Sequence, residues 1–501
     1  MWIKSVSIEN FASIIGREEY SFRQGVNFLA GDNNVGKTTI FRAIDGLFNK
    51  FGSAESCIPR VGDGEFDGHT SVEAVIEGIP KGALDLYGLK FLENFNLNQS
   101  DDSDISIKIR RSTEPLTVKV ESKTQKIDEK KLAVFNPEED RFENPSGIDQ
   151  NIGQIFDVLG IWADIDPDDV GNFGSTKAMG KLMVECFDQL EATEEWASLK
   201  SSFNDIFSGE MASAKAAIEM ELLKNVGPGF PGVTSVLIDF SLPKIKELLK
   251  NGTISVNDGV QTNITAKGSG LQRALAVAIM RTYADMKNDQ ENRLLAVLMD
   301  EPETWLHPSA QIAMAQNLEE IAGSHGQLFV STHSPYMLRG YNADRDGLYV
   351  LTKSDHGRGQ RRVTDLGIMG SRPSLNEISY FAFNDFSEAF HTELFGELQL
   401  RFKEHRTKSG FQKMHGSFGG NLVEFDKFLK SCTNVSRSKR LRDDAGNEAM
   451  EVEESLPVLI RNRIHHRENK YNDPCSAQEI GCSIREMLDI LKSDILSPCE
   501  E

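Results

Sequence analysis

Nine residues near the start of the chain combine glycines, a lysine and hydroxyl side chains at a spacing suited to binding phosphate. Residues 31–39 read Gly-Asp-Asn-Asn-Val-Gly-Lys-Thr-Thr, between apolar stretches at 26–30 and 40–44. The two glycines let the backbone curl so that successive N–H groups point at one anion, and a following helix adds the positive end of its dipole. In such a loop Lys37 reaches the β- and γ-phosphates of ATP, and the Thr38 hydroxyl is a ligand of Mg²⁺. The predicted nucleotide-binding residues of the loop are Asn33, Asn34, Gly36, Lys37, Thr38 and Thr39.

Two carboxylates stand at the end of a second apolar run. Residues 294–299 read Leu-Leu-Ala-Val-Leu-Met, which is typical of a buried parallel strand, and Asp300 and Glu301 follow at once. At the carboxyl end of a strand beside a phosphate loop, the first carboxylate can hold the Mg²⁺ shell and the second can polarise water. We predict these roles for Asp300 and Glu301, in preference to simple capping of a strand.

Two more segments complete a set of four motifs in one order over residues 1–355. Residues 267–273 read KGSGLQR and residues 331–335 read STHSP, with DEPE and LHP at 300–303 and 306–308 between them. Together with the phosphate loop, these segments make the chain similar to the ABC-type ATPases of the overcoming-lysogenisation-defect (OLD) and RecF/SMC-like group. Members of the OLD family proper carry a metal-binding toprim nuclease domain after the ATPase, and we find no acidic cluster of that kind after residue 355.

The resemblance implies roles for three residues of these segments. Ser269 and Gly270 would form the signature that caps the γ-phosphate of ATP bound to another protomer, and a helix starting at Gly270 would aim free N–H groups at that anion. His333 would be the switch histidine, a neutral imidazole that hydrogen-bonds the γ-phosphate or the attacking water. The family implies a homodimer or higher oligomer that sandwiches ATP and Mg²⁺ between its heads. One departure is that the glutamine that senses Mg²⁺ in such ATPases is absent between Ile40 and Gly78.

The elements that position these residues predict an α/β fold. Short alternating strands at 2–8 and 20–22 indicate an antiparallel β-layer laid against the nucleotide-binding sheet. The expected architecture is an ABC-type P-loop ATPase domain with a mixed sheet, an α+β insertion and a helical C-terminal domain. The predicted domains are an ATPase N-lobe at 1–80, an insertion at 81–234, an ATPase C-lobe at 235–362 and an effector domain at 363–501.

Three local predictions can be compared with a structure. The ATPase core is expected to resume with strands at 235–242 and 253–256. The apolar positions of a helix at 210–226 are expected to pack as a buried face, because they recur at helical spacing. Residues 436–454 change from basic to acidic and are expected to form an exposed loop.

A basic, histidine-containing stretch stands out in the last quarter of the chain. Residues 459–469 read LIRNRIHHREN, so that Arg461, Asn462 and His466 fit the Rx4H pattern of HEPN ribonucleases, which cut RNA without metal. In that chemistry His466 moves the proton of a ribose 2′-OH, Arg461 stabilises the pentacovalent phosphate and Asn462 orients the pair. We expect this stretch to be helical, and the helix could instead form a solvated or subunit-contact face. Neighbouring basic residues, with Phe402 and Phe411 to stack bases, favour RNA, including tRNA, as a partner.

Composition and charge narrow the classes of function that remain open. The chain has 501 residues and a net charge of −21, which argues against a general nucleic-acid binder. Residues 371–501 hold 18 basic and 22 acidic residues, a net charge of −4, so the first 370 residues carry −17. The six cysteines include no CxxC pair, and no apolar run is long enough to span a bilayer. We therefore expect a cytoplasmic protein with no membrane association.

These observations favour an ATPase of bacterial antiphage defence whose ATP state gates a toxic nuclease, with RNA cleavage by its own C-terminal domain. The pairing of the two activities resembles bacterial anticodon nucleases and the ATPase subunits of Septu-like systems. An alternative is a regulatory ATPase that holds and releases a separate nuclease or toxin subunit. A third class is DNA repair of the RecF kind. It requires a basic DNA-binding face, and the negative net charge of residues 1–370 argues against one.

Overall fold

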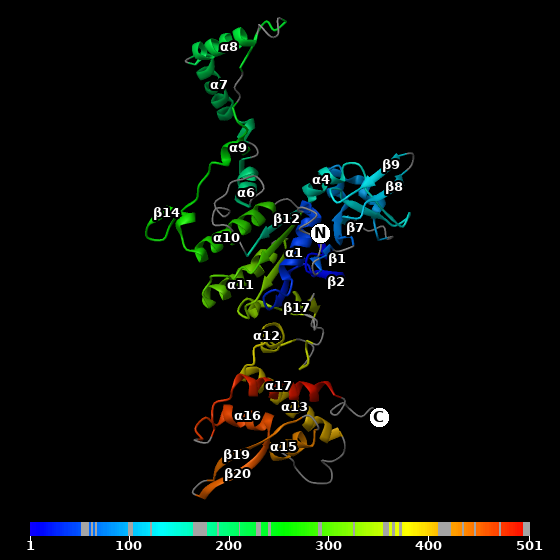
Figure 1. Ribbon diagram of the computed structural model, residues 1–501, viewed down its shortest axis with the longest axis vertical. Helices are drawn as coiled ribbons and strands as arrows, with labels where there is room; N and C mark the ends of the chain where they lie inside the picture. Colours follow the sequence, from blue (N-terminus) through cyan, green and yellow to red (C-terminus); the bar gives the residue numbers. More distant parts are fainter. Residues whose placement is uncertain are drawn as a thin grey trace.

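The computed structural model has three parts in a row along its longest axis (Figure 1): a helical arm, a central two-sheet body that carries the phosphate loop, and a C-terminal unit. The described residues are 1–51, 60–61, 64–65, 68–98, 104–120, 123–163, 178–187, 190–209, 211–226, 232–238, 242–288, 293–323, 326–353, 360–362, 366–369, 373–408, 422–432, 435–444, 447–469 and 472–493. None of the helices found in these ranges is long and apolar enough to cross a membrane.

A six-stranded sheet forms the centre of the body. Its strand order is β12-β15-β16-β3-β17-β18, and all neighbours are parallel except β17 and β18. The strands are β12 (Phe156–Ile161), β15 (Leu294–Asp300), β16 (Gly326–Thr332), β3 (Val26–Gly31), β17 (Gly347–Lys353) and β18 (Gln360–Arg362). Every residue of β3, β15 and β16 is buried, because helices or the second sheet cover both faces.

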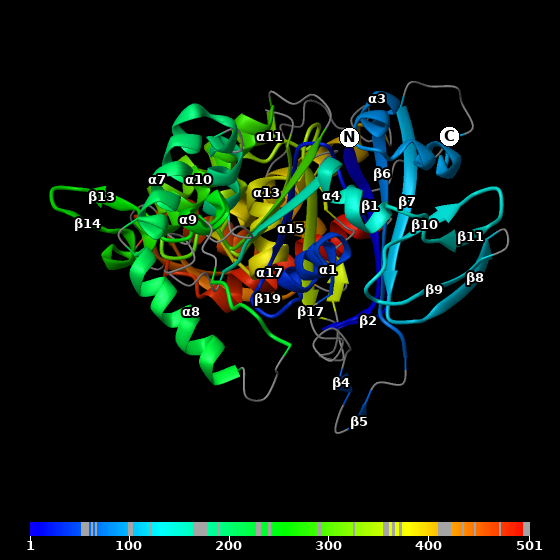
Figure 2. The same ribbon diagram turned by 90° about the horizontal axis from the view of Figure 1, so that it is seen from above.

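The second sheet is antiparallel and lies beside the first (Figure 2). Its order is β11-β10-β7-β6-β1-β2, built from β1 (Trp2–Phe11), β2 (Ile14–Ser21), β6 (Ser71–Pro80), β7 (Asp104–Ser112), β10 (Ala133–Asn136) and β11 (Arg141–Glu143).

This pairing contradicts the predicted start of an insertion at residue 81. Strands β7, β10 and β11 extend the antiparallel layer, and β12 pairs with β15, so residues up to 161 belong to the body. Smaller elements on this side are α3 (Lys81–Leu86), η1 (Lys90–Phe95), β8 (Leu116–Val120), β9 (Lys123–Ile127) and α4 (Ile148–Ile155), with a hairpin of β4 (Arg60–Val61) and β5 (Gly64–Glu65).

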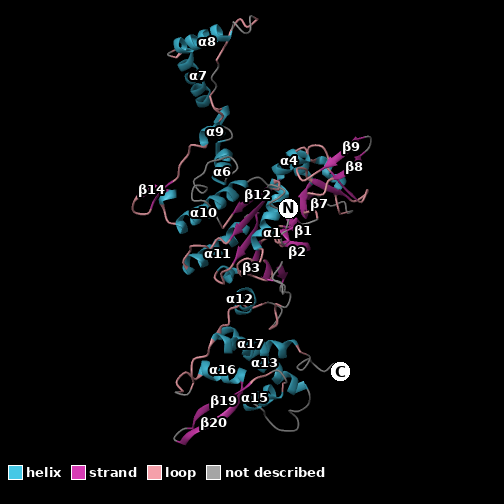
Figure 3. Cartoon of the chain, viewed as in Figure 1, coloured by secondary structure: helices cyan, strands magenta, loops and turns pink. Residues whose placement is uncertain are grey.

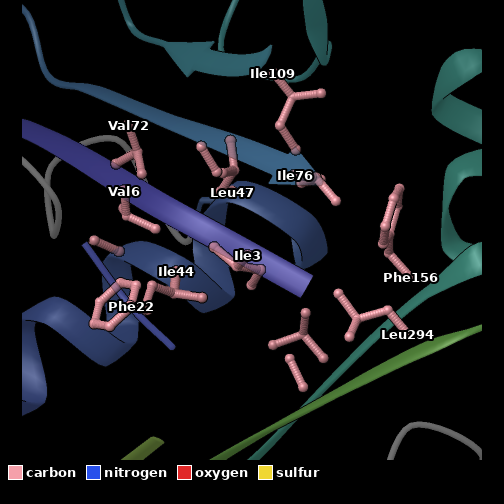
Figure 4. Close-up of a cluster of buried hydrophobic side chains, with 14 of the residues drawn as sticks. Ile3, Val6, Phe22, Ile44, Leu47, Val72, Ile76, Ile109, Phe156 and Leu294 are labelled. Atoms are coloured by element: carbon pink, nitrogen blue, oxygen red, sulfur yellow. The ribbon is translucent and has the colours of Figure 1, made fainter. Parts of the chain in front are cut away.

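Helix α1 (Lys37–Asn49) packs between the two sheets, which fixes the helix that follows the phosphate loop. Its buried side chains Ile44 and Leu47 meet Ile3 and Val6 of the antiparallel sheet (Figure 4), and the same cluster reaches Leu298 of β15. The opposite face of the parallel sheet is covered by α10 (Ser269–Asn288), α11 (Pro308–Gly323), η4 (Met337–Gly340) and α12 (Leu375–Phe383). The body therefore has two apolar cores, one on each side of the nucleotide-binding sheet.

The arm consists of α6 (Ala178–Phe187), η2 (Leu190–Ala192), α7 (Glu194–Ser208), α8 (Ala212–Val226) and α9 (Ile245–Leu249). The predicted packing of the α8 face is wrong: Ile218 is 54% exposed and Met220 70% exposed. Helix α8 lies at the far end of the arm beside α7 (Figure 1). Its apolar residues do share one face, but no other part of the described chain covers that face.

The strand prediction for 235–242 is also wrong over the residues described there, which have no regular structure, and Leu237 is exposed. Strand β13 (Ser255–Asn257) pairs with β14 (Gln261–Asn263) in a separate hairpin and does not join the main sheet, and η3 (Ile264–Ala266) leads from it to α10.

The C-terminal unit is mostly helical (Figure 3) and has its own core. It contains α13 (Glu388–Lys408), α15 (Leu422–Ser431), β19 (Arg437–Asp444), β20 (Asn447–Ser455), α16 (Leu456–His465) and α17 (Ala477–Lys492). The predicted loop at 436–454 is the β19–β20 hairpin, in which Lys439 lies opposite Glu453. The prediction of a loop is therefore wrong, because the two halves of this segment pair as antiparallel strands.

Candidate functional site

The phosphate loop lies between β3 and α1, as its sequence predicts. Gly36 has φ 90° and Asn34 φ 62°, both in the left-handed region, and a Cβ at Gly31 would collide with the carbonyl oxygen of Leu351. Lys37 is buried, and its Nζ donates to the carbonyl oxygens of Gly31 at 2.8 Å and Asp32 at 2.9 Å. These bonds fold the loop around the ammonium group. Burial lowers the pKa of Lys37, and the nearby carboxylate of Glu301 opposes that shift.

Thr38, in the first turn of α1, contacts Asp300, the last residue of β15. The Thr38 hydroxyl lies 2.9 and 3.0 Å from the two carboxylate oxygens of Asp300, and the Ser331 hydroxyl donates to Asp300 Oδ1 at 2.5 Å. Because β15 pairs in register with β16, Asp300 and Ser331 are direct neighbours. Hydroxyl and carboxylate oxygens are the donors that Mg²⁺ prefers, so the residues present fit this ion.

Glu301 follows Asp300 with a φ of 46°, a backbone conformation that is unusual for glutamate. Its Oε1 lies 3.8 Å from Lys37 Nζ, and its Oε2 lies 3.5 Å from Nδ1 of His333. The hydrogen bond with His333 is the main reason why the pKa of Glu301 lies below its usual value. The same contact raises the pKa of His333. The arrangement therefore favours an imidazolium beside a carboxylate, rather than the neutral imidazole that the sequence led us to expect. The structure thus brings Lys37, Glu301 and His333 together.

Glu303 anchors the segment that carries His333. Its carboxylate is buried, and Oε1 accepts hydrogen bonds from the Thr332 hydroxyl at 2.6 Å and the His333 N–H at 2.9 Å. Burial raises the pKa of Glu303. Sequence reasoning gave this residue no specific role, and its hydrogen bonds to Thr332 and His333 make it a positioning residue for the histidine. His307, which matched the same family, lies at the surface with Nδ1 3.0 Å from the Ser309 hydroxyl.

Arg273 is the residue of this site that sequence reasoning missed. Its guanidinium is buried, and one nitrogen donates to the carbonyl oxygens of Asp300 at 2.7 Å and Glu301 at 2.8 Å. The other terminal nitrogen donates to the Ala163 carbonyl oxygen at 3.1 Å, at the end of β12. The available signal was an arginine four residues after Ser269, on the helix expected to start at Gly270. Nothing local indicated that it would hold the backbone of both carboxylates.

Ser269 and Gly270 begin α10 and do not lie inside this cluster. Ser269 is exposed and Gly270 half-buried, and a Cβ at Gly270 would lie 3.2 Å from the carbonyl oxygen of Trp305. Gln272 donates to the Lys267 carbonyl at 2.9 Å and so holds the turn that leads into α10. At the phosphate loop, the Ser13 hydroxyl lies 2.8 Å from the hydroxyl of Thr39. The predicted signature is therefore a surface feature of the single chain.

The C-terminal motif is placed differently from the prediction of one continuous helix. Helix α16 ends at His465, and the His466 N–H closes the last turn on the Asn462 carbonyl at 2.9 Å. Asn462 is buried; its amide donates to the Glu454 carboxylate at 3.2 Å and accepts from Arg461 at 3.0 Å. The side chain of His466 is half-exposed, with Nδ1 3.1 Å from Glu468. Arg461 and Asn462 are in contact, and the histidine stands at the surface.

The predicted base-stacking residues are not placed for that purpose. Phe402 is buried and packs against Phe425 and Phe428, and Phe411 lies outside the described residues. Arg401 donates to Glu397 and to the Ile368 carbonyl. Across the ranges with described side chains, no group of three or more His, Cys, Asp or Glu residues is arranged to hold a metal ion.

Comparisons with known proteins show which family the chain belongs to. A family model described as AAA ATPase domain matches residues 1–161 and 171–338. The Old nuclease of Escherichia phage P2 is 28% identical over 362 residues, which cover 68% of this chain and 58% of that protein. The endonuclease GajA of Bacillus cereus (strain HuB5-5) is 21% identical over 416 residues, covering 71% of this chain and 59% of that protein.

The chain thus spans less than two thirds of the length of these two relatives. A solved SMC head bound to the C-winged helix domain of ScpA aligns with 72% of this chain and 98% of that chain, at 15% identity and a TM-score of 0.39. The family match, the sheet order and the phosphate loop together confirm the predicted fold class, a P-loop ATPase fold of the ABC type with a helical C-terminal region.

Proposed function

Because the chain belongs to the AAA ATPase domain family, we propose that it binds and hydrolyses ATP with Mg²⁺ at the site around Lys37. One observation carries this proposal: Thr38 touches Asp300 while Glu301 lies between Lys37 and His333. A cation-binding pair and a carboxylate able to polarise water, beside a phosphate-binding lysine, are the parts that phosphoryl transfer to water requires.

Each side chain has a task in this reaction. Lys37 binds the β- and γ-phosphates, and Asn33, Asn34, Gly36 and Thr39 belong to the loop that cradles them. Glu301 is the general base that polarises the attacking water, and its low pKa keeps it ionised. His333 hydrogen-bonds the γ-phosphate or the water. Bound through Thr38 and Asp300, Mg²⁺ would supply charge neutralisation at the phosphates.

Hydrolysis on this proposal takes place in a head-to-tail dimer. Ser269 is exposed at the N-terminus of α10, a 20-residue helix whose first N–H groups and positive dipole end suit a phosphate. Ser269 and Gly270 would cap the γ-phosphate of ATP bound to a second copy. Two such sites would close the dimer around two ATP molecules.

The proposed task is antiphage defence, in which the ATP state gates a toxic activity of the C-terminal unit. Support comes from the similarity to the Old nuclease and to the endonuclease GajA, both named as nucleases. The activity we propose is RNA cleavage, with a tRNA as one candidate substrate. His466 would move the proton of the 2′-OH and Arg461 would stabilise the phosphate, while Asn462, held by Glu454, would orient Arg461.

The alternative is a regulatory ATPase that holds and releases a separate nuclease or toxin subunit. The uncovered apolar face of α8 favours a partner of some kind. A DNA-repair function of the RecF kind would require a basic face, which the charge of residues 1–370 does not favour.

The ATPase proposal is tested with Glu301→Gln in the full chain. Turnover should fall by about 10²–10⁴-fold, because the general base is lost, while Mg·ATP stays bound and the dimer accumulates. Glu19→Gln, an exposed glutamate on β2, is the matched control and should retain normal turnover. Normal turnover of Glu301→Gln would remove that residue from its role, and failure of the unmodified chain to bind ATP would end the proposal.

The nuclease proposal is tested by incubating the purified chain with total cellular RNA, with and without ATP, and sequencing the cut ends. His466→Ala and Arg461→Ala should abolish cleavage and relieve toxicity on expression, with ATP hydrolysis intact. His465→Ala changes the adjacent exposed histidine and should cut normally. If the His466 and Arg461 variants cut RNA like the unmodified chain, the cleavage does not use this motif. If the unmodified chain cuts no RNA, the regulatory alternative replaces the nuclease.

A further inference from the structure

Trp305 is held on the surface although it is the kind of side chain that folding normally buries. It is 76% exposed, and its φ of 68° is in the left-handed region, where a bulky residue is rarely found. Within the described part of the chain, the indole has no hydrogen-bond, ion-pair or ring-stacking partner. Burial of a tryptophan ring stabilises a fold more than burial of most other side chains, and this chain does not use that stabilisation at Trp305.

The backbone around Trp305 is fixed, so the exposed position is built into the fold. The Thr304 N–H donates to the Glu301 carbonyl at 3.1 Å, and the Leu306 N–H donates to the Glu303 carbonyl at 2.9 Å. The Leu306 carbonyl in turn accepts from the Gln311 amide at 2.9 Å. These bonds tie the turn to the backbone of Glu301, the residue after β15, and to helix α11.

Trp305 also shares its surface with the proposed signature. Its carbonyl oxygen lies where a Cβ on Gly270 would come within 3.2 Å, and the preceding residue, Ser269, is exposed. The backbone of Trp305 therefore lies beside the start of α10, and both Trp305 and Ser269 are exposed there. The occupant of this face follows from the proposed function, on which the inference rests: it is a second copy of the chain with ATP bound in its phosphate loop.

We propose that Trp305 is the apolar anchor of the ATP-bound dimer, inserting beside the phosphate loop of the second copy when Ser269 engages that copy's nucleotide. Exposed aromatics that lose water at the centre of an interface dominate binding energy, and tryptophan is the residue most enriched among them. The backbone around Trp305 is already fixed, so association costs little conformational entropy there, and this favours binding. The turn also connects the anchor to Glu301, so closure of the dimer bears directly on the catalytic carboxylate.

The test measures dimer dissociation by sedimentation equilibrium in the Glu301→Gln chain with Mg·ATP. Trp305→Ala should weaken the dimer by about 30-fold, as expected of an interface anchor, and Trp305→Phe by less. Thermal stability should not change, because the side chain is exposed. Leu86→Ala, which truncates an exposed apolar residue on α3, is the matched control and should dimerise normally.

A second measurement uses the indole as its own probe. Dimer formation by the Glu301→Gln chain should shift its tryptophan emission to shorter wavelength, and Trp305→Phe should lose that shift although the three other tryptophans remain. A dimer that tolerates Trp305→Ala within threefold would overturn the inference and leave the proposed function standing. So would weaker ATP binding by the Trp305→Ala monomer, which would place the ring on the nucleotide. No dimer at all would overturn both.

Discussion

Replacing Arg273 should damage the ATP site without touching any group that meets the nucleotide. In Arg273→Ala the carbonyl oxygens of Asp300, Glu301 and Ala163 each lose a charged donor at 2.7 to 3.1 Å. A buried acceptor left without a partner costs about 1–3 kcal/mol. Water can reach part of this site, so we expect a loss of about 3 kcal/mol in the free energy of unfolding. A domain with about 5–15 kcal/mol of stability survives such a loss.

The catalytic effect of Arg273→Ala should exceed its effect on stability. Glu301 has a left-handed backbone, a conformation that costs about 1–3 kcal/mol and persists only where surrounding contacts enforce it. Arg273 supplies one of those contacts through the Glu301 carbonyl. A displacement of about 1 Å at a catalytic group can reduce turnover by about 10²-fold, and we expect a fall of that size in kcat.

The assay combines kcat for ATP hydrolysis with urea unfolding for Arg273→Ala, Arg273→Lys and the control Arg281→Ala. Lysine keeps the charge but lacks the planar fork that reaches two carbonyls, so its turnover should be intermediate. Arg281 lies two turns further along α10 and is half-exposed, and its variant should retain normal turnover. Turnover within twofold of normal in Arg273→Ala, at normal stability, would refute the positioning role.

Three titratable groups give further expectations. His333→Gln removes the main cause of the low pKa of Glu301, so that pKa should rise and the acid limb of kcat/KM should move to higher pH; an unmoved limb contradicts this. Burial raises the pKa of Glu377, so ionisation destabilises the fold as pH rises above 4.5; Glu377→Gln should therefore gain stability relative to the native chain between pH 4.5 and 7, measured by urea midpoint. Burial lowers the pKa of His391 from 6.5 to about 4, so the unfolding free energy should fall by up to about 3 kcal/mol as pH drops across that window, and His391→Gln should remove that slope.

The site motifs could be predicted because each is a local pattern whose geometry is set by its own backbone. A loop with Gly36 between an apolar strand and a helix leaves few arrangements, and the loop lies where the sequence places it. Asp300 ends a strand in which every residue is buried, and the hydrophobic run alone indicates that strand. Contacts across the sheet, such as Ser331 with Asp300, follow from strand register, which no local pattern encodes.

The errors share a physical origin, because they concern partners rather than local conformation. The spacing of Met211, Ile218 and Leu222 predicts a helix correctly, but spacing does not say what covers the helix, and these side chains are exposed. Phe402 looked available because its neighbours are charged, yet Phe425 and Phe428 from α15 enclose it. Strand β7 looked like part of an insertion because its partner β6 is separated from it by more than twenty residues.

The packing of α12 supplies a physical route for the proposed coupling between ATP state and the C-terminal unit. Ile378 and Ala382 are buried in the core that includes β3, the strand that enters the phosphate loop. Tyr380 of the same helix packs in the C-terminal core, with its ring centroid 5.1 Å from that of Phe390. The Glu377 carboxylate accepts the N–H groups of Gly367 and Ile368, which ties the incoming segment to the helix. A shift of β3 on closure of the dimer would therefore reach the C-terminal core through one rigid helix, since close-packed elements move together rather than deform.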